Sequence, residues 1–241
     1  MSASGRPMIG VLGGMGPLAT VELLRRVVES TPAREDGDHI HMFVDNNPHV
    51  PSRIAALVEG GGTSPEAELR RMARRLRDGG CDLLVMPCNT AHFYVDAVRE
   101  ESGLEVLDIV SLTMSRLSRR RPAVSRVGIL GSKAVERTGL FARACQSVGM
   151  EAVFPVDAQA DALMDLIKSV KSNAPQEELR RRFGEILETY RPNCGRNPDI
   201  LLVACSELSI LYTSKGEREG VEDSLRVLVD EILRRGGVVN N

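Results

Sequence analysis

The fold is decided by one stretch of the chain, Cys81-Asp-Leu-Leu-Val-Met-Pro-Cys88-Asn-Thr90. It contains a short apolar run that ends at a cysteine and two polar residues. Short apolar runs of this kind are typical of strands buried in a parallel sheet. Much later the chain repeats the pattern as Pro198-Asp-Ile-Leu-Leu-Val-Ala-Cys205-Ser-Glu207. The two stretches predict two equivalent strands, each with a cysteine directly after it.

The repetition extends to the segments that precede these strands. Gly10-Val-Leu-Gly-Gly14 matches Gly128-Ile-Leu-Gly-Ser132, and both sit at the start of their half. Gly10 lies 78 positions before Cys88, and Gly128 lies 77 positions before Cys205. This near-equal spacing favours an internal duplication over chance.

Strand and helix patterns alternate through both halves. We expect strands at residues 8–12, 39–44, 82–86, 106–110, 127–130, 152–155 and 200–204. We expect helices at 18–30, 67–77, 139–148, 161–170, 176–190 and 220–235, and a basic helix or linker at 111–121. The alternation predicts an α/β protein with two pseudo-symmetric, doubly wound parallel-sheet domains and an active site in the cleft between them. We place the domains at residues 1–112 and 113–211, with residues 212–241 packing back on the first.

Composition narrows the function. A chain of 241 residues with 42% hydrophobic content can bury a sizeable core. Its formal net charge of -2 and its 3% aromatic content argue against a nucleic-acid partner. No apolar run reaches the roughly 18 residues of a membrane span, and the N-terminal residues lack the apolar core of a signal peptide. We therefore expect a cytoplasmic protein whose five cysteines are free thiols.

The two repeated cysteines offer a specific chemistry. Ligands of open parallel sheets bind beyond the carboxyl ends of the strands, so Cys88 and Cys205 are expected to flank one cleft. A thiol titrates at about 8.5 and can serve as base or acid near neutral pH when its surroundings favour the thiolate. Two such groups on opposite faces of a carbon could remove a proton from one side and return one to the other. Structural burial of both thiols is the ordinary alternative.

Four blocks of sequence together resemble the aspartate/glutamate racemase superfamily, most closely its aspartate racemase branch. They are Gly13-Gly-Met-Gly-Pro17 with Ala19-Thr20, Asp45-Asn-Asn-Pro48 with Pro51 and Arg53, Pro87-Cys-Asn-Thr-Ala-His92, and Cys205-Ser-Glu-Leu208. The resemblance implies a two-domain enzyme, often a homodimer, that inverts acidic amino acids without pyridoxal phosphate, metal or other cofactor. It also implies that Cys88 and Cys205 are the catalytic pair.

The resemblance assigns substrate-binding roles as well. Asn89, Thr90 and Ser206 would hold the amino acid's α-carboxylate or amino group, while Met15 and Ser132 would line the pocket. Arg53 and Lys168 would bind a carboxylate of the substrate. The chain departs from the family pattern at Ser52, at Ser206 and at Val135-Glu136. A carboxylate at Glu136 would repel an acidic side chain, so a racemase of broad or non-acidic specificity stays open beside aspartate or glutamate.

Two other classes of protein are compatible with parts of the sequence. Gly14-Met-Gly-Pro-Leu-Ala19 fits the short G-x-G-x-x-A pattern of NAD-binding oxidoreductases, and Asp45 ends the next strand. A small-ligand binding protein without catalysis would use the same fold. A metal site is poorly supported, because Cys88 and His92 form the only ligand-like pair. We expect His39, His41 and His49 to be structural or surface residues.

Overall fold

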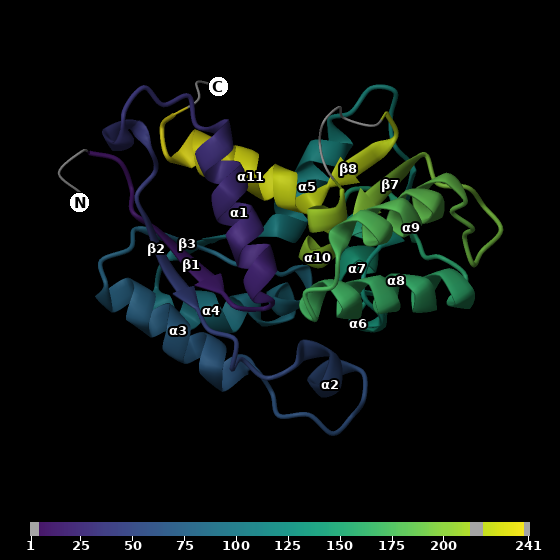
Figure 1. Cartoon of the computed structure of the whole chain (residues 1–241), viewed down its shortest axis with the longest axis horizontal. Helices are drawn as coiled ribbons and strands as arrows, with labels where there is room; N and C mark the ends of the chain where they lie inside the picture. The colour runs from purple at the N-terminus through teal and green to yellow at the C-terminus, as the bar shows by residue number, and fades with distance from the viewer. Residues whose placement is uncertain (1–4, 213–218, 239–241) are drawn as a thin grey trace.

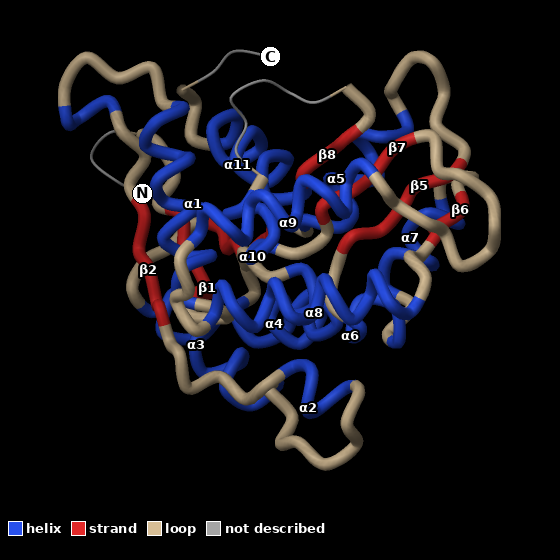
Figure 2. Tube along the Cα trace, turned by 45° about the vertical axis from the view of Figure 1, so that its right-hand side comes forward, coloured by secondary structure: helices blue, strands red, loops and turns tan. Residues whose placement is uncertain are grey.

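The computed structural model describes residues 5–212 and 219–238 and contains two four-stranded parallel sheets. Figure 2 shows their strands as two separate groups. The first has the order β2-β1-β3-β4 and the second has the equivalent order β6-β5-β7-β8, which confirms the predicted fold class. The strands are β1 (Ile9–Gly13), β2 (Met42–Asn46), β3 (Leu83–Val85), β4 (Glu105–Leu107), β5 (Arg126–Leu130), β6 (Glu151–Val153), β7 (Ile200–Val203) and β8 (Val221–Asp223).

The duplication seen in the sequence is repeated in the strand register. Gly10 in β1 lies beside Leu84 in β3, and Gly128 in β5 lies beside Leu201 in β7. A Cβ at Gly10 would come within 2.6 Å of the Leu84 side chain, and one at Gly128 within 2.7 Å of Leu201. Both glycines therefore leave room for the leucine of the neighbouring strand.

Helices cover both sheets, with α1, α3 and α4 on the first half and α7, α8 and α9 on the second (Figure 1). Their sequences are amphipathic: α3 buries Leu69, Met72 and Leu76 against the sheet and leaves its arginines on the outer face. The helices are α1 (Pro17–Ser30), α2 (Arg53–Leu57), α3 (Glu66–Asp78), α4 (Val95–Ser102), α5 (Ile109–Ser118), α6 (Lys133–Arg137), α7 (Leu140–Ser147), α8 (Asp157–Lys171), α9 (Gln176–Glu188), α10 (Ser206–Leu211) and α11 (Ser224–Arg235), with the 3-10 segments η1 (Asp36–Asp38) and η2 (Asn89–Tyr94). No helix of the described residues is long and apolar enough to cross a membrane.

The two halves are joined by the helices that follow their last strands. Helix α5 leaves β4 of the first sheet and packs against α7, whereas α11 leaves β8 of the second sheet and packs against α1 and α5. One apolar core consequently contains Val27 of α1, Ile129 of β5 and Leu228 of α11. This reciprocal packing fixes the two sheets relative to each other.

Helices α2, α4, α6 and α10 were not expected from the sequence, and two junctions between strand and helix differ from the prediction. The strand expected at 106–110 ends at Leu107, because the Asp108 side chain accepts the N–H groups of Val110 and Ser111 and starts α5. The helix expected at 220–235 is preceded by β8, and Asp223 starts α11 in the same way by accepting from Leu225 N–H. Of the segment 212–241, β8 belongs to the second sheet and α11 packs on α1, while residues 213–218 and 239–241 lie outside the described residues. The division into domains stays a prediction, and its boundary falls within α5.

Candidate active site

One pocket collects the residues that follow four strands of the two sheets. Met15 follows β1, Cys88 follows β3, Ser132 follows β5 and Cys205 follows β7, because parallel strands present their carboxyl ends at one edge. The pocket encloses about 410 Å³ of empty space, counted to its open mouth. Its lining consists of Met15, Ser52, Arg53, Ile54, Cys88, Asn89, Thr90, Ser132, Ile167, Lys171, Ala204, Cys205, Ser206 and Glu207.

The structure brings all but one of the predicted site residues to this pocket. The exception is Lys168, whose side chain is exposed outside it. The lysine that lines the pocket is Lys171, one turn further along α8 and on the same face as Ile167. Residues four apart share a helix face, whereas neighbours such as Ile167 and Lys168 are turned about 100° apart, which explains the difference.

The second thiol lies in a chain of charged contacts. The Cys205 thiol donates a hydrogen bond to Glu207 Oε2 at 3.1 Å, and Glu207 Oε1 lies 3.4 Å from Lys171 Nζ. Burial raises the pKa of Cys205 well above its usual value, and the Glu207 carboxylate raises it further, while the Lys171 charge opposes the rise. Cys205 is therefore a protonated thiol at neutral pH.

The turn that carries the first thiol is held in place by His92. His92 Nδ1 lies 3.0 Å from the Cys88 carbonyl oxygen, and His92 Nε2 accepts the Ile109 N–H at 3.2 Å. A ring that accepts through Nε2 is neutral and donates from Nδ1. Burial lowers the pKa of His92, which keeps it in this state. His92 thus ties the turn after β3 to the start of α5.

Hydrogen bonds between the halves fix both cysteine turns. Ser206, next to Cys205, donates to the Pro87 carbonyl at 2.8 Å. Asn89, next to Cys88, donates to Ser224 Oγ at 3.1 Å, and Ser224 donates to the Val203 carbonyl at 2.9 Å. Asn89 and Ser206 occupy equivalent places in the duplication, so each half is held to the strand end of the other.

Three buried polar atoms of the pocket residues have no hydrogen-bond partner within the described parts of the chain. One is Glu207 Oε1, which faces the Lys171 ammonium group at 3.4 Å. The other two are Asn89 Oδ1, an acceptor, and Arg53 Nε, a donor. The terminal nitrogens of Arg53 donate to the carbonyls of Val50, Pro51 and Met15 at 2.9 to 3.3 Å, which holds the guanidinium in place. Buried polar groups are usually paired, so these two atoms indicate where a polar ligand binds.

Sequence reasoning did not predict that four further residues line the pocket, namely Ser52, Ile54, Ile167 and Lys171. The spacing of Ile167 and Lys171 on one helix face was the available signal for α8. The Glu136 carboxylate does not line this pocket; it lines a smaller cavity on the other side of Ser132. The repulsion of an acidic substrate expected from Glu136 therefore does not arise in the pocket, although Glu207 contributes a carboxylate there.

The structure gives another reason for the glycine and the aspartate that fit the NAD-binding pattern, Gly14 and Asp45. A Cβ at Gly14 would lie 2.1 Å from the Asn47 carbonyl oxygen, so the glycine is required for the turn to pass the loop after β2. The Asp45 carboxylate is paired with Arg75 at 2.8 Å and is not free to bind a ribose. Among the described residues no group of three or more His, Cys, Asp or Glu could hold a metal ion.

Comparisons with known proteins agree with the resemblance. Residues 12–232 match the family described as Asp/Glu/hydantoin racemase. The chain is 25% identical to a broad specificity amino-acid racemase, RacX, of Bacillus subtilis, over 84% of this chain and 86% of that protein. An aspartate racemase of Picrophilus torridus has a similar structure, with a TM-score of 0.82, 27% identity, and 96% of this chain and 94% of that one covered. An aspartate racemase homologue of Pyrococcus horikoshii, 19% identical, shares the fold with a TM-score of 0.71 over 96% and 99% of the two chains. The chain therefore belongs to the Asp/Glu/hydantoin racemase family and is an enzyme of the isomerase class.

Proposed function

We propose that this protein is a cofactor-independent amino-acid racemase in which Cys88 and Cys205 form the acid–base pair, with aspartate or glutamate as substrate. The observation that carries the proposal is that two thiols from equivalent strand ends line one pocket. The remaining pocket groups are those that an amino-acid zwitterion needs.

The proton transfers follow from this pairing. One cysteine, as thiolate, takes the α-proton of the bound amino acid, and the electron pair of the broken C–H bond stays on the planar carbanion. The other cysteine, as thiol, gives its proton to the opposite face of that carbon. The product has inverted configuration and the two cysteines have exchanged protonation states. A raised pKa favours Cys205 as the proton donor of the resting enzyme.

The contact with Glu207 gives Cys205 a route to its basic form. For the reverse reaction Cys205 must lose its proton, and the carboxylate at 3.1 Å is the nearest acceptor that the hydrogen bonds of the site provide. Glu207 is then neutral and the negative charge lies on Cys205 Sγ, where the nearby Lys171 charge, which lowers the pKa of Cys205, stabilises the thiolate. We propose Glu207 as a positioning residue that controls the protonation of Cys205.

Four side chains are suited to the substrate's own charges. Asn89 Oδ1 is an unpaired acceptor for the substrate ammonium group, and Thr90 and Ser132 offer hydroxyls, whose oxygens lie 3.4 Å apart. Arg53 Nε is an unpaired donor for a carboxylate oxygen. With Lys171 already facing Glu207, Arg53 is the cation left for an acidic side chain.

A racemase of broad specificity is the second candidate. Ile54 and Ile167 form an apolar part of the pocket wall, and the Glu207 carboxylate disfavours a second negative charge nearby. The similarity to the Bacillus subtilis protein supports the same candidate. A homodimer and a cytoplasmic location stay predictions from the sequence.

The test is exchange of the α-hydrogen in deuterated water under reducing conditions, without added cofactor, over a panel of acidic, neutral and basic amino acids. We expect inversion together with deuterium incorporation for aspartate or glutamate; equal rates across neutral amino acids would favour the broad-specificity candidate. Absence of both exchange and inversion for the whole panel would contradict the racemase proposal.

Variants then test the thiol pair. C88S and C205S are each expected to reduce racemisation by at least about 100-fold, the usual contribution of a positioned acid or base. The matched control is C194S, because Cys194 is an exposed thiol away from the pocket. Full racemase activity in either C88S or C205S would refute the two-thiol mechanism and leave the fold assignment untouched.

A further inference from the structure

A second pocket lies where β8 meets α11, and it shares no lining residue with the candidate active site. Its empty volume is about 930 Å³, counted together with the open solvent at its mouth. Three arginines line it: Arg116 in the last turn of α5, Arg120 in the loop that follows this helix, and Arg226 in the first turn of α11. The racemase chemistry proposed above makes no use of this cavity.

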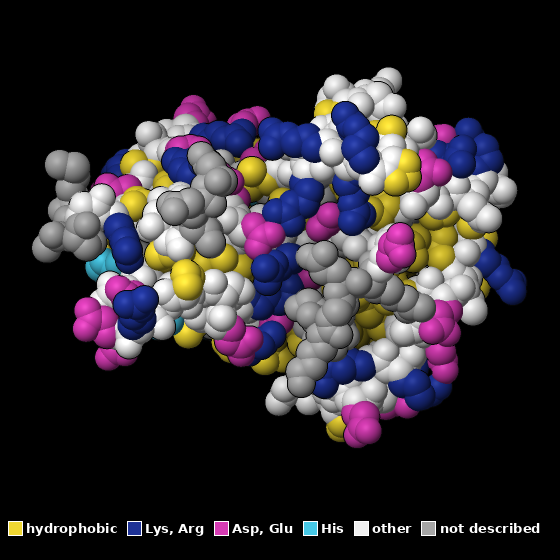
Figure 3. Space-filling model, turned by 90° about the horizontal axis from the view of Figure 1, so that it is seen from above, with side chains coloured by type: hydrophobic (Ala, Val, Ile, Leu, Met, Phe, Trp, Pro, Cys, Tyr) yellow, Lys and Arg dark blue, Asp and Glu magenta, His cyan; other side chains and the backbone are white. Residues whose placement is uncertain are grey.

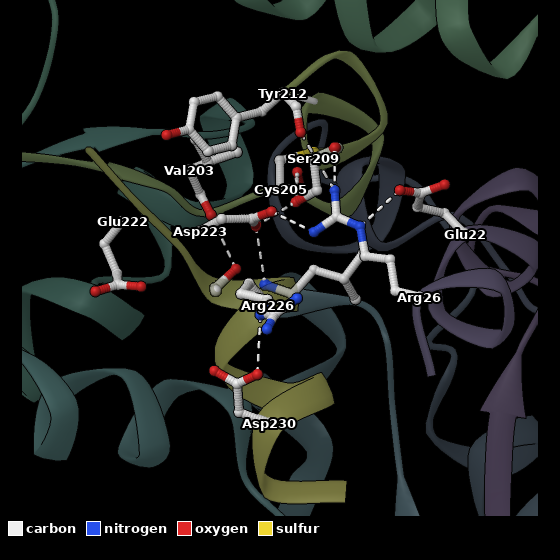
Figure 4. A network of polar contacts seen from close by, with 12 residues as sticks. Glu22, Arg26, Val203, Cys205, Ser209, Tyr212, Glu222, Asp223, Arg226 and Asp230 are labelled. Carbon is white, nitrogen blue, oxygen red and sulfur yellow. Dashed lines mark hydrogen bonds and ion pairs between the residues drawn. The ribbon is translucent and has the colours of Figure 1, made fainter. Parts of the chain in front are cut away.

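The carboxylates around these arginines are already engaged. Asp230 is shared between Arg116 at 2.7 Å and Arg226 at 2.9 Å. Asp223, in the pocket wall, is bound from behind by Arg26 at 2.5 Å (Figure 4). Among the described residues of the lining itself, three arginines (Arg116, Arg120 and Arg226) stand against two carboxylates (Glu222 and Asp223).

Two observations describe the electrostatics around these arginines. Glu222 lies 3.8 Å from Arg116; burial raises the pKa of its carboxyl group, and the charges of Arg116 and Arg120 act against that rise. Within residues 5–212 and 219–238, Arg120 has no carboxylate at ion-pair distance. Figure 3, which views this side of the molecule, shows Lys and Arg side chains gathered across the middle of the face.

We propose that this pocket binds a small organic phosphate, with the phosphate group between Arg120 and the Arg116–Arg226 pair. Guanidinium groups match the oxygens of a phosphate in charge and in geometry, and a dianion answers the excess charge better than one carboxylate does. The cavity is larger than a phosphate ion needs, and Val221 and Tyr212 in its lining provide surface for the organic part.

The experiment is calorimetric titration of the full-length protein with phenyl phosphate, inorganic phosphate and succinate at constant ionic strength. We expect saturable binding of phenyl phosphate, weaker binding of inorganic phosphate and the weakest binding of succinate. R120Q and R226Q, tested separately, are each expected to weaken phenyl phosphate binding by about 10- to 100-fold, because each removes a charge-assisted hydrogen bond.

Two control variants test whether the phosphate binds in this pocket. R119Q removes an exposed arginine next to Arg120 that lines a neighbouring groove but not this pocket, so it should leave binding unchanged. An equal loss in R119Q and R120Q would mean diffuse attraction to a basic surface and would overturn the proposal. Loss of binding in R53Q with full binding in R120Q would place the anion in the candidate active site and would overturn it as well. Tighter binding of succinate than of phenyl phosphate would overturn the choice of phosphate.

Discussion

Replacement of Arg26 by methionine is expected to destabilise the protein by about 3 to 5 kcal/mol, the usual cost of leaving one member of a buried ion pair alone. Arg26 lies on α1, its side chain is 7% exposed, and it bonds to Asp223 of β8 at 2.5 Å and to the Ser209 carbonyl of α10 at 2.5 Å (Figure 4). Burial opposes the charged form of Arg26, yet the Asp223 and Glu22 carboxylates keep its pKa raised. The pair therefore joins the two halves as ions.

The magnitude follows from what the substitution leaves behind. Methionine fills part of the volume but leaves the Asp223 carboxylate, 3% exposed, with Ser209 Oγ at 2.7 Å and Leu225 N–H at 3.0 Å as its remaining partners among the described residues. Glu22 loses less, because it also pairs with Arg25 at 2.8 Å. For a protein of this size, 3 to 5 kcal/mol corresponds to a fall in Tm of about 6 to 20 °C.

Urea unfolding followed by far-UV circular dichroism is the suitable assay, since the chain has no tryptophan. The matched control is R25M on the same helix: Arg25 is 49% exposed and pairs with Glu22 and Glu29 on the helix surface, so the expected loss is about 0 to 1 kcal/mol. D223N and the double variant R26M/D223N complete a double-mutant cycle. If R26M costs no more than R25M, or if the two single effects simply add, the buried pair does not stabilise the contact between the halves.

Three further outcomes test other parts of the structure. G14A is expected to cost at least about 3 kcal/mol, because Gly14 has φ +88° and a Cβ would meet Asn47 at 2.1 Å; G61A, which has open space, should change the free energy of unfolding by less than about 0.5 kcal/mol. Burial raises the pKa of Cys145 to about 11, so the stability that this thiol contributes is complete below pH 9 and is lost as pH rises toward 11. The loss of stability with rising pH should be smaller in C145A. An unchanged pH profile would contradict a raised pKa at Cys145. Burial lowers the pKa of His92, so its stabilising effect is present above pH 6.5 and is lost as pH falls below that value. The free energy of unfolding should therefore differ less between pH 8 and pH 5.5 in H92Q than in the wild type. An equal difference in the two proteins would count against a neutral buried His92.

The duplicated motif made the architecture predictable. Gly10 and Gly128 mark equivalent strands, and their spacing to Cys88 and Cys205 places both thiols at strand ends from the sequence alone. Local patterns predicted the junction of strand and helix wrongly at two three-residue strands, β4 and β8, where an aspartate caps the following helix. At Asp108 apolar residues flank the aspartate on both sides, in Val106-Leu-Asp-Ile-Val110, so periodicity alone does not show where the strand ends and the helix begins. At Asp223 the strand Val221–Asp223 holds a single apolar residue, which is too little for a pattern.

Within the site, sequence reasoning identified residues beside the cysteines better than residues on remote helices. Asn89, Thr90 and Ser206 are carried to the pocket by the same strand ends as the thiols. Lys168 was predicted from the family resemblance, but the face that α8 turns to the pocket is set by how its apolar side packs, and that face presents Lys171.

The sequence by itself determined the α/β class, the internal duplication and the position of each thiol at the end of its strand, because these depend on local periodicity and on repeated spacing. Only the tertiary structure decided which charges meet: Glu207 with Lys171, Arg26 with Asp223, and Ser206 with the Pro87 carbonyl. Two of these contacts join residues more than 100 positions apart, and they exist because α5 and α11 fix one sheet against the other. No local pattern in the chain encodes that orientation.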